Sequence, residues 1–544
     1  ANAIANTTLK SDYLAEFTAN YNKTWNEVHN FSGVAGYSVQ KDMIDVLGVK
    51  ATGYEDDHIT EVTGHGADPS DIQSNNTYKS NWTMLSYFAR LNYNYANKYY
   101  LTASFRGDAS SLFGPENRWG YFPSISAAWT LSNEDFWIPL RNTVDKLKFK
   151  LTYGLVGNDA IGSSEDRFYY LSEVNPNDGN RDQFFGTDYD NHMNGVSVSR
   201  YPNIYITWEK SKKVNLGFEL GMFNSALEIQ TDFFYERRTQ IYQPRAHIPS
   251  SMGLSAGVSA NIGEASSRGI DLSANYSYIA NKDFWIKGMG NFTLAKGRYE
   301  VYEELDYASY GQGYRSRIGQ AINHNYGYIA ERLFIDVNDV ANSPSQTSFN
   351  GGAMPGDIKY KDLNGDKVID EFDRTIIGGE KPISYFGLDL GFNYRGLEFS
   401  MLWQGVYNRD IYLSDWTLLE GFQSNNQHYG QAYENMLGRW TPETASTATF
   451  PRLTAGGNEY NRGNGWNSSF WMRSGNFIRL KNVSLAYSLP KMFCQKYLGG
   501  IGIKIFVNGQ NLFTKAACDL VDPEVSFTSY PLQRCISTGI NVKF

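Results

Sequence analysis

The sequence predicts an all-β protein, a transmembrane antiparallel β-barrel with short turns at one end and long loops at the other. Three observations support this prediction. Segments such as Ile501–Val507 alternate strictly between apolar and polar residues, which gives a strand one apolar and one polar face. Connections of a few residues alternate with connections of several tens of residues. Aromatic residues are abundant at 15% and charged residues sparse at 19%, which suits a surface that meets lipid.

Composition excludes several other classes. The chain has 544 residues, a net charge of -8 and no basic cluster, so a nucleic-acid partner is not expected. Its mean hydropathy of -0.46, together with the lack of any apolar run near about 18 residues, excludes membrane-spanning helices. A soluble β-sandwich is the remaining alternative, but a sandwich has no reason to collect all its long loops on one side.

We expect about fifteen strands, each recognised by its period-two alternation. The last three run from Asn476 to Phe544, and Ile536, Thr538, Ile540, Val542 and Phe544 share one face of the final strand. A further two flank a turn at Ala96–Lys98, and another opens just after Gly269. The other expected strands are Tyr13–Thr24, His29–Gln40, Tyr121–Leu131, Lys146–Val156, Val214–Phe223, Ala226–Tyr242, Phe284–Gly297, Phe386–Tyr394 and Leu397–Tyr407.

Blocks of sequence from about Tyr93 to Phe544 resemble the SusC/RagA-like TonB-dependent outer-membrane transporters. They include N-Y-N-Y-A-N-K-Y-Y-L-T-A-S-F-R-G-D, G-Y-F-P-S-I-S-A-A-W, L-K-F-K-L-T-Y-G-L-V-G-N, P-G-D-I-K-Y-K-D-L-N-G-D and V-N-G-Q-N-L-F-T. The blocks follow the order of the family. Ala109 and Lys367 stand where the family usually has glycine.

The resemblance implies a multi-pass β-barrel in the outer membrane of a Gram-negative bacterium, with short periplasmic turns and long extracellular loops. It implies energy-dependent import of oligosaccharides or peptides, a SusD-like lipoprotein as a lid and a TonB-type periplasmic protein as the source of energy. A TonB-dependent receptor for a metal chelate or cofactor is one alternative. A passive porin-like channel is another.

The family's barrel is implied to have about 22 strands, more than this chain supplies. Counting strand directions back from the last strand makes the strand at Tyr13 descend, as an eighth strand of such a barrel would. Because an open sheet edge cannot face lipid, we expect residues 1–544 to be the C-terminal part of the barrel. The plug and about seven strands are then expected upstream or on a companion chain.

The segment D-L-N-G-D-K-V-I-D-E-F-D has the oxygen-ligand spacing of a calcium loop. Side-chain oxygens at positions one, three, five, nine and twelve, with a main-chain carbonyl at seven, suit a hard cation. Lys367 replaces the usual glycine at position six, and the twelfth residue is aspartate, not glutamate. A metal-free polar turn is the alternative. The predicted Ca²⁺ ligands, in an extracellular loop, are Asp362, Asn364, Asp366, Val368, Asp370 and Asp373.

Two of the three cysteines, Cys518 and Cys535, are expected on the long-loop side, and Cys494 on the other side. The oxidising cell envelope allows a Cys518–Cys535 disulfide, with free thiols as the alternative. Aromatic residues of the long loops could stack on a ligand or pack the loops together, and packing is the expected fate of any one of them. Examples are Tyr407, Trp416, Tyr429, Trp466 and Trp471.

Known catalytic motifs are absent from the sequence: it has no H-E-x-x-H, no G-x-S-x-G and no P-loop. The glycine-flanked motif G-Q-G-Y-R-S-R-I-G, residues 311–319, lies in an expected loop with no strand directly before it, which argues against a phosphate loop. We therefore expect a transporter and not an enzyme. The residues that bind its cargo are not identified by any motif.

Overall fold

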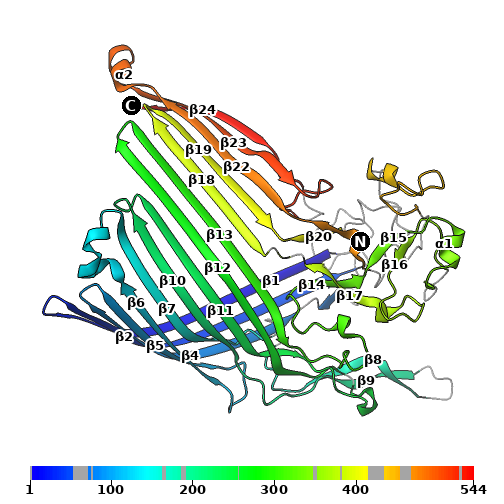
Figure 1. The fold of residues 1–544 in the computed structure, drawn as a ribbon. Helices are drawn as coiled ribbons and strands as arrows, with labels where there is room; N and C mark the ends of the chain where they lie inside the picture. The colour runs from blue at the N-terminus through cyan, green and yellow to red at the C-terminus, as the bar shows by residue number, and fades with distance from the viewer. Residues whose placement is uncertain are drawn as a thin grey trace.

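Fifteen strands form one continuous antiparallel sheet in a computed structural model of the chain (Figure 1). The structure describes residues 3–52, 72–74, 77–161, 167–185, 191–254, 256–346, 352–379, 381, 383–413, 434–453, 467–525 and 530–544. The fifteen strands are β1 (Ala3–Trp25), β2 (His29–Ala51), β4 (Tyr78–Tyr95), β5 (Tyr99–Ser110), β6 (Trp119–Thr130), β7 (Val144–Asn158), β10 (Glu209–Met222), β11 (Leu227–Pro244), β12 (Ser259–Asn281), β13 (Phe284–Val301), β18 (Ser384–Tyr394), β19 (Leu397–Tyr407), β22 (Phe477–Ser488), β23 (Gly502–Ala516) and β24 (Cys535–Lys543).

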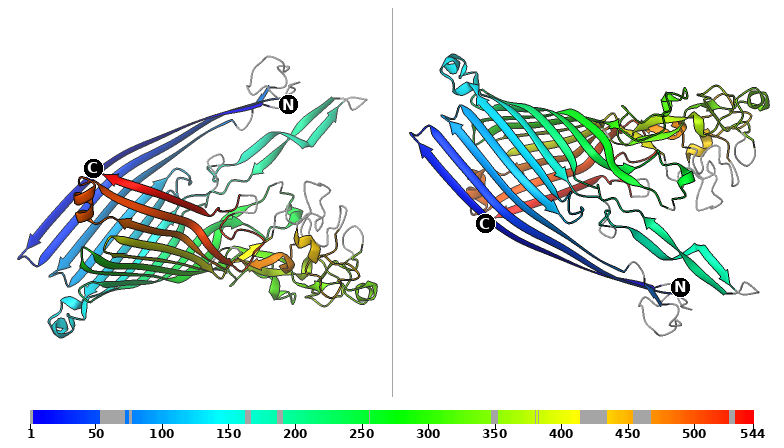
Figure 2. Two further views of the ribbon diagram at one scale, coloured as in Figure 1. Left: turned by 90° about the horizontal axis from the view of Figure 1, so that it is seen from above. Right: turned by 90° about the horizontal axis from the view of Figure 1, so that it is seen from below.

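Each strand of this sheet pairs with the strands that precede and follow it along the path, and β3 (Ile72–Ser74) adds a short extension to β2. The sheet curves round on itself without closing, as the views along its edges show (Figure 2). In the described part of the chain, β1 pairs only with β2, and β24 pairs only with β23. The predicted antiparallel barrel sheet of about fifteen strands is therefore confirmed. The plug and the further strands stay a prediction.

One end of the sheet carries only compact connections, and we call it the short-turn end. The backbone has positive φ at Asn26, Ala96, Asn224 and Arg395, with values of 48° to 58°. Left-handed residues in tight hairpins match the twist of the paired strands. Other connections at this end are the 3₁₀ helices η2 (Leu131–Asn133) and η3 (Asp135–Leu140), and the helix α2 (Lys491–Tyr497).

The opposite end, the long-loop end, carries the extended connections of the described residues (Figure 1). Residues 159–208 contain a separate hairpin, β8 (Glu173–Phe185) with β9 (Asn191–Arg200), which projects away from the sheet (Figure 2). The remaining elements here are η4 (Ser250–Met252), η5 (Gly313–Arg315), β14 (His324–Tyr328), β15 (Ala330–Leu333), α1 (Val337–Ala341), β16 (Ile358–Tyr360), η6 (Glu371–Asp373), β17 (Arg374–Gly379), β20 (Asp410–Tyr412), η7 (Glu434–Gly438), η8 (Ser469–Trp471) and β21 (Met472–Ser474). No helix of the described residues is both long enough and apolar enough to cross a membrane.

Apolar side chains stand exposed on one face of the sheet, the reverse of a soluble protein. Leu101, Leu151 and Leu216 are 46%, 53% and 49% exposed and lie in one cross-strand row over β5, β7 and β10. On the opposite face, Ser86 and Asp108 are buried. A large continuous apolar surface is unfavourable in water. The exposed apolar face is therefore the face that a membrane barrel turns to lipid.

The long loops pack around a hydrophobic core of their own, which we call the loop-end core. It joins residues from three connections, those between β13 and β18, β19 and β22, and β23 and β24: Tyr328, Leu333, Ile358, Tyr360, Ile369, Tyr412, Leu413, Met436, Phe450, Trp471 and Cys518. At its margin the fully buried carboxylate of Asp357 accepts a hydrogen bond of 2.7 Å from Nε of Arg452. The described parts of these three connections are thus folded against one another.

A buried ion-pair network fastens residues 517–525 to the inner, polar face of the sheet. The side chain of Arg479 on β22 is only 3% exposed. It donates to Oδ2 of Asp522 at 2.8 Å, to Glu524 and to Thr514. Lys481 also contacts Glu524, at 3.2 Å. Because the loop supplies the acids and the wall supplies the cations, the network fixes where this loop leaves the sheet.

Replacing Leu151 by lysine should destabilise the folded barrel far more than replacing the adjacent Thr152 by lysine. Both side chains are exposed, but Leu151 lies on the apolar face and Thr152 on the polar face. A lysine near the middle of the lipid-facing band costs about 2–4 kcal/mol. Denaturant titration of the protein in phospholipid vesicles, followed by the gel shift between folded and unfolded barrel, measures the difference. Equal destabilisation by the two variants would contradict this assignment of the faces.

Replacing Arg479 by methionine should loosen residues 517–525 from the wall, because Asp522 and Glu524 then lose their buried cation. Breaking such a pair costs about 3–5 kcal/mol. We expect faster tryptic cleavage at Arg534 and a lower melting temperature of the folded barrel. The matched control is Lys504→Met, which removes a half-exposed pair with Glu398 at the short-turn end, a contact worth at most about 1 kcal/mol. Unchanged cleavage in Arg479→Met would contradict the anchoring role.

Candidate functional site

The inner face of the sheet carries ladders of charged side chains that run across neighbouring strands. Lys150 on β7 contacts Glu219 on β10 at 3.1 Å and Asp232 on β11 at 3.8 Å, and Lys146 contacts the same glutamate at 2.8 Å. These residues alternate with the apolar side chains of the outer face. The alternation therefore places a charged surface inside the curve of the sheet, as is usual for the polar interior of a membrane barrel.

A second inner cluster joins the sheet to the long-loop end. Nε1 of Trp82 donates to Oγ of Ser110 at 3.1 Å and to Oδ2 of Asp159 at 3.2 Å, and Ser110 donates to the same carboxylate oxygen at 2.7 Å. Next to it, buried aromatic and aliphatic side chains fill the rim: Phe113, Phe122, Ile161, Ile206 and Trp208. Side chains therefore pack tightly against one another at the long-loop end of β4–β7.

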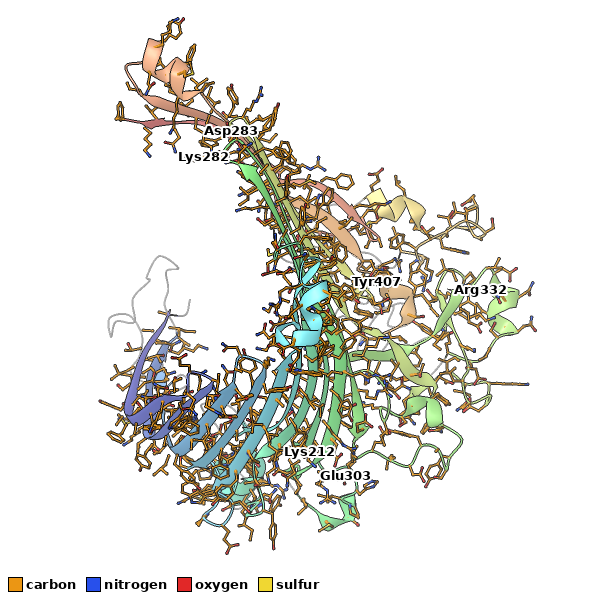
Figure 3. All side chains as sticks on the ribbon, turned by 60° about the vertical axis from the view of Figure 1, so that its left-hand side comes forward. Lys212, Lys282, Asp283, Glu303, Arg332 and Tyr407 are labelled. Carbon is orange, nitrogen blue, oxygen red and sulfur yellow. The ribbon has the colours of Figure 1, made fainter. Side chains whose placement is uncertain are left out.

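Side chains stand on both faces of the wall along its whole height (Figure 3). Lys282 and Asp283 mark the short-turn end, and Tyr407 and Arg332 mark the long-loop end. The folded loops lie at the end of the wall that Tyr407 marks. The candidate site therefore combines the loops with the inner face.

The predicted calcium loop forms a compact turn between β16 and η6. The carboxylate of Asp362 accepts hydrogen bonds from the main-chain N–H groups of Gly365 at 2.6 Å and Lys367 at 2.9 Å. Lys367 has a φ of 66°, in the left-handed region that glycine adopts at little cost. The turn therefore forms even with the lysine that departs from the usual pattern at position six.

Asp373 is fully buried beside this turn. Its carboxylate accepts from the N–H groups of Leu363 at 2.7 Å and Asp370 at 2.9 Å, and burial raises its pKa above the ordinary value for aspartate. The oxygen-rich donor set suits a hard cation, but no three acidic, histidine or cysteine side chains converge as a metal site within the described residues. Calcium binding by this loop stays a prediction.

The three cysteines are free thiols in this structure. Cys518 is buried in the loop-end core, whereas Cys535 is exposed at the start of β24, so the Cys518–Cys535 bridge is not formed. Cys494 is buried in α2 at the short-turn end. In this structure the cysteines therefore follow the alternative in which they remain free thiols.

Two of the five aromatic loop residues can be placed. Trp471 is completely buried in the loop-end core, so it packs the loops as expected, while Tyr407 is 57% exposed at the end of β19. Trp416, Tyr429 and Trp466 lie outside the described residues.

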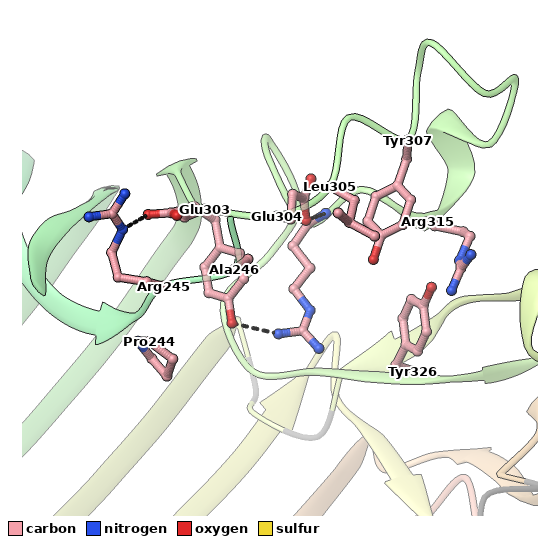
Figure 4. Close-up of a pocket in the computed structure, with 11 residues that line it drawn as sticks. Pro244, Arg245, Ala246, Glu303, Glu304, Leu305, Tyr307, Arg315 and Tyr326 are labelled. Carbon is pink, nitrogen blue, oxygen red and sulfur yellow. Dashed lines mark hydrogen bonds and ion pairs between the residues drawn. The ribbon is translucent and has the colours of Figure 1, made fainter. Parts of the chain in front are cut away.

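Sequence patterns missed a polar pocket at the long-loop end, with a volume of about 270 Å³ (Figure 4). It lies between the end of β11 and the segment that follows β13. Of its charged lining residues, Arg245 comes from the connection after β11, and the connection after β13 supplies Glu303, Glu304, Arg315 and Arg317. The only available signal was the motif at residues 311–319, which supplies two of the arginines.

Comparison with known proteins identifies the family to which this sheet and its loops belong. The family model described as TonB dependent receptor-like, beta-barrel, matches residues 2–323. The chain is 28% identical to TonB-dependent receptor P3 of Formosa agariphila over 99% of the chain and 52% of the relative. It is 26% identical to TonB-dependent receptor SusC of Bacteroides thetaiotaomicron over 99% of the chain and 52% of that relative. The chain thus spans about half the length of the curated relatives it matches.

Among solved structures, that of the RagAB peptide transporter superposes with a TM-score of 0.73 at 21% identity, covering 99% of this chain and 56% of that one. At this level of identity the likeness shows the fold alone. The predicted resemblance to SusC/RagA-like proteins is confirmed. The chain belongs to the TonB-dependent receptor-like β-barrel family.

Proposed function

We propose that this chain forms part of the barrel wall and the loops of an outer-membrane transporter that imports nutrients by a TonB-dependent mechanism in a Gram-negative bacterium. The observation that carries the proposal is the two-faced sheet of fifteen strands, apolar outside and charged inside. A wall of this kind separates lipid from a hydrated passage. Membership of the family supports an active transporter.

The proposed cargo is an oligosaccharide or a peptide. The RagAB structure is described as that of a peptide transporter, which supports a peptide, and the resemblance of the sequence to SusC/RagA-like transporters implies an oligosaccharide as the other class. We further propose a SusD-like lipoprotein as a lid over the long-loop end and a TonB-type protein as the periplasmic source of energy. A plug and the remaining strands complete the barrel in this proposal.

Deletion of the gene should abolish growth on a subset of oligosaccharides or peptides and leave growth on the corresponding monomers unchanged. The reason is that monomers are small enough to pass general porins, whereas larger cargo needs a dedicated transporter. Growth of the deletion strain on panels of single carbon sources measures the effect. Complementation with the wild-type gene is the control.

Depletion of TonB in the wild-type strain separates the alternatives. We expect it to reproduce the deletion phenotype. Uptake that continues without TonB would show a passive channel, and a defect limited to chelated metals or cofactors would show a receptor of that class. Either result would overturn the proposed import of oligosaccharides or peptides.

The loop from Asp362 to Asp373 is proposed to bind Ca²⁺ and to stiffen its connection. Calorimetric titration of the folded protein with Ca²⁺ should show binding, because carboxylate and carbonyl oxygens are the ligands this ion prefers. Asp366→Ala should abolish the signal. Asp135→Ala, which removes an exposed carboxylate at the short-turn end, is the matched control. Equal heats for wild type and Asp366→Ala would remove the site.

A further inference from the structure

The pocket at the long-loop end is built mainly from arginine and tyrosine side chains (Figure 4). Arg315 lies with Tyr307 and Tyr326 on one side, and Arg245 lies with Glu303 on the other. The wall of the barrel ends directly beside it, because Pro244 closes β11 and Tyr302 follows β13. A ligand held here would sit at the rim of the proposed passage.

The two glutamates of the pocket already have partners. Glu303 accepts a hydrogen bond of 2.6 Å from Nε of Arg245 and another from the main-chain N–H of His247. Glu304 accepts from the hydroxyl of Ser316 and from the main-chain N–H of Arg317 at 3.0 Å. Both carboxylates are therefore held in place.

The guanidinium groups of Arg315 and Arg317 form no ion pair with a carboxylate in the part of the chain that the structure describes. Instead, Arg315 donates to Oε1 of Gln312 at 2.9 Å, and Arg317 donates to the hydroxyl of Tyr302 at 2.8 Å. Three arginines and two glutamates line the pocket, so its lining has one positive charge in excess. An excess of this size matches a ligand with a single negative charge.

Aromatic rings hold these arginines in fixed positions. The guanidinium carbon of Arg315 lies 4.8 Å from the ring centre of Tyr307, and that of Arg317 lies 5.1 Å from the ring centre of Tyr302. Such stacking fixes the planar guanidinium group before a ligand arrives. Less conformational freedom is then lost on binding.

A fourth arginine, which lies just outside the lining, reinforces the positive potential. Arg374 stacks on Tyr326, a pocket residue, at 5.2 Å. The Nε–H groups of Arg315 and Arg374 are buried and donate to no acceptor in the described residues. Burial alone would lower the pKa of Arg315, but its hydrogen bond with Tyr326 raises that pKa above the ordinary value. Arg315 therefore keeps its charge in a partly desolvated position, where an anion is attracted more strongly than in water.

From this geometry we propose that the pocket is a binding site for a carboxylate group of the cargo, with Arg315 and Arg317 as its main ligands. Arginine presents paired N–H donors that match the two oxygens of a carboxylate. The pocket volume is near the lower end of the range for small-molecule sites, enough for one acidic unit of a longer molecule. This inference rests on the proposed function in taking the ligand as cargo, and it narrows that cargo to acidic molecules.

Binding to the complete protein in detergent micelles tests the site with defined probes. Trigalacturonate and triglutamate carry carboxylates on a sugar and on a peptide, and maltotriose is neutral. We expect at least one acidic probe to bind and maltotriose to bind at least about tenfold more weakly. If only one acidic probe binds, its identity shows whether the carboxylate belongs to a sugar or to a peptide. Equal or tighter binding of maltotriose would overturn the proposal.

The variants Arg315→Gln and Arg317→Gln should each weaken binding of the acidic probe by about tenfold or more, because each removes charged hydrogen-bond donors. Arg317→Lys, which keeps the charge but not the paired donors, should be intermediate. The matched control is Arg395→Gln, since Arg395 also stacks on a tyrosine, Tyr394, but lies at the short-turn end. Heat-modifiable migration on a gel confirms that each variant is folded.

Unchanged affinity in both folded glutamine variants would falsify the site. Because the assay measures binding without TonB, its result is independent of the growth experiments. A loss of affinity in the variants with no transport defect in the deletion strain would leave the site in place and remove only the proposed import.

Discussion

The structure depends on one constraint: in lipid, every main-chain N–H and C=O group of the wall must find its partner within the sheet. Continuous antiparallel pairing from β1 to β24 meets this demand in the interior of the sheet. The position of Pro123 shows how closely the sequence follows this constraint. Pro123 has no N–H, and the ladder between β6 and β7 begins one residue later, at Ser124 paired with Gly154. The missing donor therefore falls where no neighbouring strand needs it.

Period-two alternation predicts a strand only where the two faces meet different solvents. It identified β19 with both bounds correct, Leu397–Tyr407. It failed at the first half of β1, where residues 3–12 form a strand that was not expected, and at β12, which begins at Ser259 and not just after Gly269. Both missed segments extend toward the long-loop end and are rich in Ser, Thr, Asn, Ala and Gly. Where both faces of a strand meet water, neither face needs a row of apolar residues. The period-two alternation that predicts a strand is then absent.

The loops were harder to predict for a different reason. Their order comes from contacts between distant connections, such as Asp357 with Arg452, which no local pattern announces. The hairpin of β8 and β9 lay within an expected loop, and its residues lack alternation. The calcium-like spacing and the two arginines of residues 311–319 could be recognised from sequence. That Arg315 and Arg317 meet the ends of β11 and β13 required the fold.

The loop-end core has a consequence for how such a protein can diversify. The wall is held by main-chain pairing and the loops by a separate set of buried side chains, with Trp471 and Tyr360 at its centre. The Arg479 network and the cluster around Trp82 link the two units, but the buried side chains of the loop-end core are separate from the paired main chain of the wall. Natural selection can therefore exchange residues at the rim at less cost to membrane insertion than residues of the wall. In this sense the rim can vary separately from the wall within a single continuous chain.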